Sequence, residues 1–126
     1  MRKLKLDELN RVDIEGFKAQ EKLPVIIMLD NVRSMHNVGS VFRTADGFSI
    51  EKVVLCGITA QPPHREIEKT ALGATLAVEW EHFEDTLIAV NTLRKEGYII
   101  IAIEQAENST MLHTFTPDHT KKYALI

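Results

Sequence analysis

Five short segments of the chain are rich in apolar residues and have the length of β-strands. They are Val25–Leu29, Lys52–Cys56, Leu76–Trp80, Tyr98–Ile103 and Tyr123–Ile126. Most of them are continuously apolar instead of alternating with polar positions. Such runs are typical of strands that are covered on both faces, as in a parallel sheet.

Segments with helical spacing separate these runs. They are Leu4–Lys22, Ser34–Ala45, Arg65–Leu72 and Asp85–Lys95. Strands that alternate with helices predict an α/β fold, with a parallel sheet, flanking helices and right-handed crossovers. Ligands of such sheets bind beyond the carboxyl ends of the strands. We therefore expect the functional site in the loops after Leu29, Cys56 and Ile103.

Two of these helices have a predicted core face. In the helix after the first strand, the residues at helical spacing are Val38, Val41, Phe42 and Ala45. In Asp85–Lys95, the residues expected to point inward are Leu87, Ile88, Leu93 and, in part, Val90. The chain from Glu104 to His119 is expected to be mostly loop, with one helical turn near Met111.

Length and composition predict one globular domain. The chain has 126 residues, of which 44% are hydrophobic and 26% are charged, which is not typical of disordered, collagenous or coiled-coil proteins. No apolar run approaches the ~20 residues needed to span a membrane. We expect residues 1–23 to be an N-terminal helical extension and residues 24–126 to form the main unit. A single cysteine, Cys56, allows no intrachain disulfide, which fits the reducing cytoplasm.

Charge is distributed unevenly along the chain. Residues 1–43 carry eight Lys/Arg and six Asp/Glu, whereas residues 44–126 carry seven and twelve. A mildly basic first third indicates either a local anion site or charges scattered over a solvated surface. The five histidines are not spaced as metal ligands, so no metal site is expected.

Candidate chemistry is concentrated in the helix after the first strand. At separations of three and four, His36, Gly39 and Arg43 share one helix face. Glycine costs a helix ~1 kcal/mol relative to alanine, but it permits close approach of a ligand or of another backbone. Arg43 offers five donors that suit a phosphate or carboxylate. The alternative is an ordinary surface helix, capped by Ser34, whose arginine forms an ion pair.

The motif Asn37-x-Gly39-x-x-x-Arg43 after a buried strand resembles the first motif of a known family. This family is the SpoU (TrmH-like) RNA 2′-O-ribose methyltransferases of the SPOUT superfamily. Further segments that support the resemblance are Asp30–Arg33, Phe42–Ala45, Glu68–Ala74, Val78–Trp80 and Lys122–Ile126. Together they cover nearly all of the chain from residue 24 onward.

The resemblance implies a homodimeric enzyme that methylates tRNA or rRNA with S-adenosylmethionine. In this family, the second and third motifs form a C-terminal trefoil knot that binds the cofactor. Those motifs would follow Ile126, so we expect this chain to be the Rossmann-like N-terminal portion of such an enzyme and inactive alone. The cofactor-binding residues are then expected after Ile126.

The resemblance also implies roles for individual residues. Arg43 corresponds to the family arginine that engages the ribose 2′-hydroxyl or its adjacent phosphate, and Asn37 corresponds to the asparagine that orders this site. Weaker candidates for contacts to RNA phosphates are Arg33, His36, Arg65 and Lys69. For Lys69, a solvated helix lysine is an equally good interpretation.

Two other functional classes stay open at this point. One is a non-enzymatic RNA-binding or dimerisation module that lacks the cofactor knot. The other is a flavodoxin-like or receiver-like signalling domain, because Asp30 follows the first strand. A receiver also needs an acidic pair and a lysine after its fifth strand, and neither is evident. The sequence has no Gly-x-Ser-x-Gly or Gly-x-Gly-x-x-Gly motif.

Overall fold

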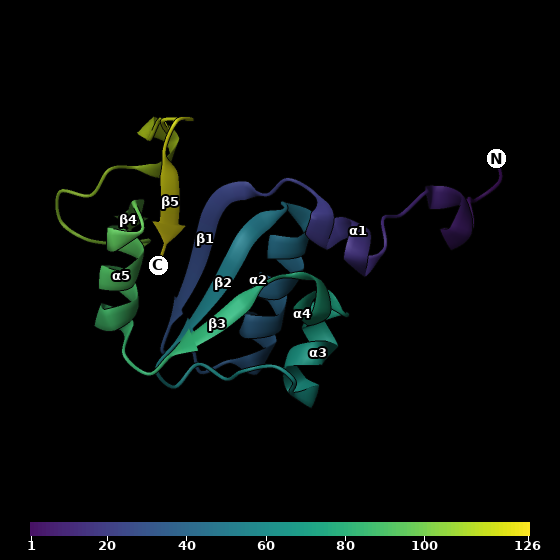
Figure 1. Cartoon of the computed structure of the whole chain (residues 1–126), viewed down its shortest axis with the longest axis horizontal. Helices are drawn as coiled ribbons and strands as arrows, with labels where there is room; N and C mark the ends of the chain where they lie inside the picture. Colours follow the sequence, from purple (N-terminus) through teal and green to yellow (C-terminus); the bar gives the residue numbers. More distant parts are fainter.

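The computed structural model describes residues 1–126 and contains one sheet of five parallel strands (Figure 1). The strands are β1 (Leu23–Asp30), β2 (Ile50–Cys56), β3 (Trp80–Phe83), β4 (Tyr98–Ile101) and β5 (Lys122–Leu125). Their order in the sheet is β3-β2-β1-β5-β4. The predicted α/β fold with a parallel sheet is confirmed.

Helices flank both faces of this sheet. They are α1 (Ile14–Ala19), α2 (Met35–Gly47), α3 (Arg65–Ala71), α4 (Ala74–Ala77) and α5 (Thr86–Lys95). Two short 3₁₀ turns, η1 (Leu6–Leu9) and η2 (Leu112–Thr114), complete the secondary structure. The α2, α3 and α4 helices lie on one face of the sheet, and α5 lies on the other. Figure 1 shows α5 beside β4 and β5, away from the other helices.

Each face of the sheet has its own core. The larger cluster contains Phe42 and Val38 of α2, both fully buried, with Ile67 of α3. The smaller cluster joins Ala89 and Leu93 of α5 to β1, β2, β4 and β5. Since β1 contributes to both clusters, its continuous apolar run is explained by cover on both faces. Of the predicted core face of α2, three residues are buried and Val41 is half-buried.

The prediction of a strand over Leu76–Trp80 is wrong. Leu72 and Gly73 both adopt positive φ, at 50° and 89°, and end α3. The chain then forms the single helical turn α4, in which Leu76 is 65% exposed, and the strand begins only at Trp80. Within so short a segment, apolar positions do not distinguish a helical turn from a strand.

The predicted orientation of α5 is also partly wrong. Leu87 and Ile88 are 67% and 60% exposed, whereas Ala89 and Leu93 are buried. The Asp85 carboxylate accepts hydrogen bonds from the backbone N–H groups of Leu87 and Ile88, at 2.7 and 3.1 Å. This cap fixes the first turn with small Ala89 toward the sheet.

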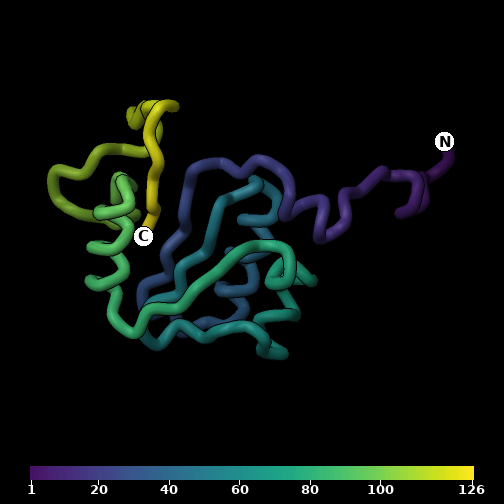
Figure 2. The backbone as a smooth tube through the Cα atoms, in the orientation of Figure 1, coloured from purple at the N-terminus to yellow at the C-terminus, as the bar shows by residue number.

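The N-terminal segment does not form the predicted continuous helix over Leu4–Lys22. It divides into η1 and α1, with Asn10 between them at a φ of 47°. Neither element contains a buried residue, so tertiary packing contributes little toward the cost of starting a helix. Figure 2 shows the first residues extending away from the domain. The division of the chain at residue 23 stays a prediction.

Candidate functional site

The α2 helix begins just beyond the carboxyl end of β1, in the region where ligands of parallel α/β sheets bind. Ser34 caps it, because its hydroxyl accepts a hydrogen bond from the Asn37 backbone N–H at 3.2 Å. Only Asn31–Ser34 separate strand and helix. The position of the helix is therefore closely tied to the end of β1.

Asn37 and Arg43 both lie on the exposed side of α2. Six residues at ~100° each place them about 120° apart around the helix, on either side of Ser40. Ser40 is also exposed, and its hydroxyl donates to the His36 carbonyl at 2.9 Å. The two candidate catalytic side chains thus flank a small residue on one solvent-facing surface. Their proposed roles stay predictions.

Gly39 does not share that exposed surface. It is buried against α3, where an added Cβ would collide with the Ile67 carbonyl oxygen and the Thr70 hydroxyl. The Cβ would also lie 2.9 Å from the Ala71 backbone nitrogen. Placing Gly39 on a polar face was therefore wrong. The sequence allowed close approach of either a ligand or another backbone at this glycine. The structure shows another backbone, that of α3.

His36 and Lys69 meet across the α2–α3 boundary through Glu66. Glu66 Oε2 lies 2.8 Å from His36 Nε2, and Glu66 Oε1 lies 2.8 Å from Lys69 Nζ. The hydrogen bond from Lys69, followed by that from His36, lowers the pKa of the Glu66 carboxyl group below its ordinary value. A bound phosphate would have to compete with this carboxylate for both cations.

The other two candidates for phosphate contacts are exposed but are not bonded to this group. Arg33 lies in the loop between β1 and α2, and Arg65 is the first residue of α3. His64 caps α3, since its Nδ1 accepts from the Glu66 backbone N–H at 3.1 Å. The structure thus brings together only His36 and Lys69 among the four weaker candidates.

Sequence reasoning missed Thr59, which ties two loops at the carboxyl edge of the sheet. Its buried hydroxyl accepts from the Val32 N–H at 3.0 Å and lies 3.0 and 2.8 Å from the carbonyl oxygens of Leu29 and Cys56. The Asn31 amide oxygen adds a bond from the Ile58 N–H at 3.0 Å. A threonine in a loop gives no sequence signal for such a role.

Polar groups at this edge are largely paired with one another. Asp30 Oδ1 accepts from the Thr86 hydroxyl at 2.6 Å and from the Asn31 amide at 3.0 Å. Burial raises the pKa of the nearby Cys56 thiol, so this cysteine is an unreactive core residue. These bonds tie the end of β1 to the start of α5.

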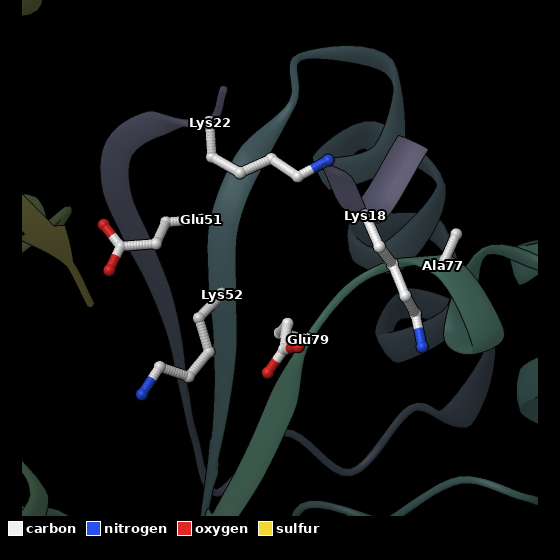
Figure 3. Close-up of a pocket in the computed structure, with 6 residues that line it drawn as sticks. All are labelled: Lys18, Lys22, Glu51, Lys52, Ala77 and Glu79. Atoms are coloured by element: carbon white, nitrogen blue, oxygen red, sulfur yellow. The ribbon is translucent and has the colours of Figure 1, made fainter. Parts of the chain in front are cut away.

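A separate cavity of about 250 Å³ lies near the amino ends of β2 and β3 (Figure 3). Its lining residues are Lys18, Lys22, Glu51, Lys52, Ala77 and Glu79. The charges there are mixed, and Lys52 forms an ion pair with Glu81 at 2.7 Å. This cavity lies away from the carboxyl edge and from Asn37, so we do not assign the site to it. No group of three or more His, Cys, Asp or Glu side chains is placed to hold a metal ion.

A family comparison connects this geometry to known proteins. The model of the SpoU rRNA Methylase family matches residues 24–126. The chain belongs to this family. The resemblance seen in the Asn37–Arg43 motif is therefore confirmed.

Relatives in the SpoU family are longer than this chain. A Staphylococcus saprophyticus protein named for the TrmH family of tRNA/rRNA methyltransferases is 32% identical over 93 residues, or 74% of this chain and 37% of that protein. The 23S rRNA (guanosine-2′-O-)-methyltransferase RlmB of Vibrio parahaemolyticus is 28% identical over 90 residues, or 71% and 36%. The chain thus spans a little over a third of the length of these relatives.

Solved structures support the same fold. An AdoMet-bound rRNA methyltransferase from Sinorhizobium meliloti superimposes with a TM-score of 0.72 at 22% identity, covering 86% of this chain and 41% of that one. The A. aeolicus TrmH/SpoU tRNA modifying enzyme gives 0.73 at 19% identity, covering 89% and 55%. At these identities the likeness establishes the SPOUT-type fold and no residue roles.

A search of the helices for membrane spans found none that combines the required length with the required apolar character.

Proposed function

We propose that this SpoU family chain forms the substrate-facing part of a cytoplasmic, homodimeric RNA 2′-O-ribose methyltransferase. The substrate is tRNA or rRNA, and the methyl donor is S-adenosylmethionine. The relatives named as tRNA/rRNA methyltransferases support the reaction class, and the AdoMet-bound structure supports the donor. The observation that carries the proposal is the exposure of Asn37 and Arg43 together on α2, directly after β1.

Arg43 supplies the charge that this reaction needs. A ribose hydroxyl becomes a nucleophile as it loses its proton, and a nearby cation stabilises the negative charge that develops on the oxygen. The guanidinium also presents paired donors to the adjacent phosphate of the RNA. Because Arg43 is exposed on a rigid helix, it can reach a bound nucleotide. Asn37, near the start of the same helix, orients the ribose.

In our proposal, the residues that bind the cofactor are not among those of this chain. When bound, S-adenosylmethionine would supply the methyl group to the ribose oxygen and leave as S-adenosylhomocysteine, while the ribose hydroxyl would release its proton. The paired state of Asp30, Asn31 and Thr59 leaves these groups committed to the loops they join. We therefore assign the cofactor cradle to the second and third motifs of the family.

Methyl transfer to RNA tests the proposal directly. A version of the protein that also carries the second and third motifs is incubated with radiolabelled S-adenosylmethionine and bulk tRNA or rRNA. Label should enter RNA and survive alkaline hydrolysis in dinucleotides, because a 2′-O-methyl group blocks cleavage of the adjacent bond. Label on the bases alone would contradict the 2′-O assignment. RNA retention without any label would favour the non-enzymatic module.

A further inference from the structure

His36 lies in the first turn of α2, directly before Asn37, and its ring is held by a carboxylate of α3. The Nε2 atom of His36 lies 2.8 Å from Glu66 Oε2. The second oxygen of the same carboxylate, Oε1, lies 2.8 Å from Lys69 Nζ. Lys69, Glu66 and His36 therefore form one bonded row, and this row has no net charge when the ring is neutral.

The Glu66 carboxylate determines which ring nitrogen carries the proton. The hydrogen bonds from Lys69 and His36 lower the pKa of Glu66, so this carboxylate is ionised near neutral pH and can only accept. The hydrogen in the contact must therefore come from Nε2 of His36, and the neutral ring has its lone pair on Nδ1. The contact with Glu66 is the only hydrogen bond of this ring, so Nδ1 is available to a substrate.

The backbone of His36 is fixed as well as its ring. Its carbonyl oxygen accepts hydrogen bonds from the Thr70 hydroxyl of α3 at 2.7 Å and from the Ser40 hydroxyl at 2.9 Å. Gly39, nearly one turn further along α2, lies directly against the α3 backbone. These contacts join the first turn of α2 to α3 and hold His36 in one place. A group that takes a proton from a substrate needs such fixed geometry.

The ring is nevertheless open to a bound substrate. The His36 side chain is 56% exposed, and it lies just beyond the carboxyl end of β1, where ligands of parallel α/β sheets bind. Seven positions separate His36 from Arg43, which places them on the same side of α2 and about 10 Å apart along its axis. Long side chains in helices lean toward the N-terminus, which for Arg43 is the direction of His36. One bound nucleotide can therefore contact both side chains.

A phosphate contact explains the arrangement of His36 less well. An anion at Nε2 would meet the Glu66 carboxylate, which already occupies that atom and repels negative charge. In the neutral ring, Nδ1 has no hydrogen to donate to a phosphate oxygen. A hydroxyl group, in contrast, can donate to Nδ1 without displacing any protein group. The available atom therefore matches the O–H group of a ribose.

We propose that His36 is the general base that takes the proton of the ribose 2′-hydroxyl, and that Glu66 is the positioning residue that keeps Nδ1 free to accept it. The proposal rests on the proposed function and adds the acceptor of the proton. As the bond between the ribose oxygen and the methyl carbon forms, the O–H bond breaks and the proton moves to Nδ1. The electron pair of the broken carbon–sulfur bond stays on the sulfur of the methyl donor. His36 then releases its proton to solvent.

The charged groups near the imidazole ring of the proposed base come from α2, α3 and the loop before α2. The α3 helix contributes Glu66 and Lys69, together with Arg65 at its first position. The preceding loop contributes Arg33, and α2 contributes Arg43. Only Glu66 is bonded to the ring. Protonation of the ring in acid fills Nδ1, so methyl transfer should fall at low pH, whereas the added positive charge should not weaken RNA binding.

Nitrogen-15 NMR of the 126-residue chain tests the tautomer without RNA or cofactor. The His36 signals are those that His36→Ala removes. At a pH where the ring is neutral, Nε2 should carry the proton, and Glu66→Ala should lower the ratio of this tautomer to the other by at least about threefold. Glu79→Ala, at an exposed glutamate of another segment, is the control and should leave the ratio unchanged. A proton on Nδ1 in the wild type, or a ratio that does not respond to Glu66→Ala, would overturn the proposal.

Methyl transfer by a version that carries the second and third motifs tests the base itself. His36→Ala should lower kcat by at least about 100-fold and leave the KM for RNA within about threefold. Added imidazole should raise the rate of His36→Ala at least about tenfold, because it replaces the missing base. Glu66→Ala should lower kcat at least about tenfold, because the ring loses its fixed tautomer. His113→Ala, at an exposed position of η2, should keep the wild-type rate.

The alternatives for His36 give different results in the same assay. If this residue bound a phosphate, His36→Ala would raise the KM, keep kcat and not respond to imidazole, and Glu66→Ala would tighten RNA binding. The acid limb of the wild-type rate should also be missing from the residual activity of His36→Ala, and a limb that stays would overturn the base role. A wild type without any methyl transfer would overturn the proposed function and the base role together, whereas a fully active His36→Ala would overturn only the base role.

Discussion

Gly39 and Arg43 lie four positions apart on α2 but have opposite surroundings. Gly39 is buried against the backbone of α3, and Arg43 is exposed. The first motif thus contains two kinds of residue, one that sets how closely two helices pack and one that faces solvent. The motif predicted that both residues lie on this helix. Only the structure shows that one is buried and the other exposed, because helical spacing does not reveal which element packs against a given face.

Arg43→Ala should lower methyl transfer by at least about 100-fold, the usual cost of losing one charge-stabilising donor. Its free energy of unfolding should change by less than about 0.5 kcal/mol, since an exposed side chain is removed. Initial rates and urea unfolding measure the two effects in a version that carries the cofactor motifs. Arg94→Ala, at an exposed position on α5, is the control and should keep its activity. Near-normal turnover in folded Arg43→Ala would remove this residue from the mechanism.

Gly39→Ala should destabilise the protein by about 2 kcal/mol, because the new methyl group collides with the α3 backbone. This loss should exceed the ~1 kcal/mol that alanine contributes to helix propensity. Gly47→Ala in the same helix is the matched control, since a Cβ there meets nothing within 4 Å. Urea unfolding of both variants gives the comparison. Equal stabilisation by both changes would show that α2 and α3 can separate without loss.

At the scale of elements, the sequence predicted those with strong local signals. Continuous apolar runs located β1 and β2, and the Ser34 cap with its following core face located α2. The errors occurred where tertiary contacts decide. The orientation of Leu87 and Ile88 depends on where α5 meets the sheet, and the N-terminal segment lacks a partner that would complete a helix. The residues that join the loops, Thr59 above all, carried no signal in the sequence.

The stability that Glu66 of α3 gains from its bonds to Lys69 and His36 should depend on pH. The pKa of Glu66 is lowered, chiefly by the hydrogen bond from Lys69. A lowered pKa stabilises the folded state above the unfolded value, and this contribution is lost as pH falls through the folded value. Glu66→Gln should therefore have a lower urea midpoint than wild type at pH 7. The two midpoints should converge well below the ordinary pKa of 4.5. Glu79→Gln, at an exposed glutamate, should run parallel to wild type. If the gap between Glu66→Gln and wild type persisted in acid, the ion pair could not be its cause.

At the scale of the whole molecule, basic residues should make RNA binding depend on salt. In a version that carries the cofactor motifs, RNA affinity should fall linearly on a log–log plot, because bound Lys and Arg release counterions. Removing two contacts with Arg65→Gln and Lys69→Gln should reduce the slope by about 1.4, at ~0.7 for each contact to single-stranded RNA. Filter binding at several salt concentrations measures this. Arg94→Gln with Lys95→Gln should leave the slope unchanged, and a flat wild-type response would show that the acidic body dominates.

The 126-residue chain should not bind S-adenosylmethionine specifically. A cofactor site needs a concave pocket with several converging polar groups. At the carboxyl edge, Asp30 is already bonded to the Thr86 hydroxyl and Thr59 to the Cys56 carbonyl. Calorimetric titration should give no saturable heat. A version that carries the second and third motifs of the family serves as the positive control. Stoichiometric micromolar binding by this chain alone would place the cofactor site within it.

The strand order also determines the sequence of events during synthesis. β5 lies between β1 and β4, and it is the only strand that pairs with β4. Tyr98–Ile101 therefore leave the ribosome more than twenty residues before the strand that can hold them arrives. During that interval β1, β2 and β3 can already pair, while the isoleucines of β4 have no strand to pair with. The nascent protein carries an unpaired, aggregation-prone strand until β5 is made, and this is the period in which a chaperone would protect it.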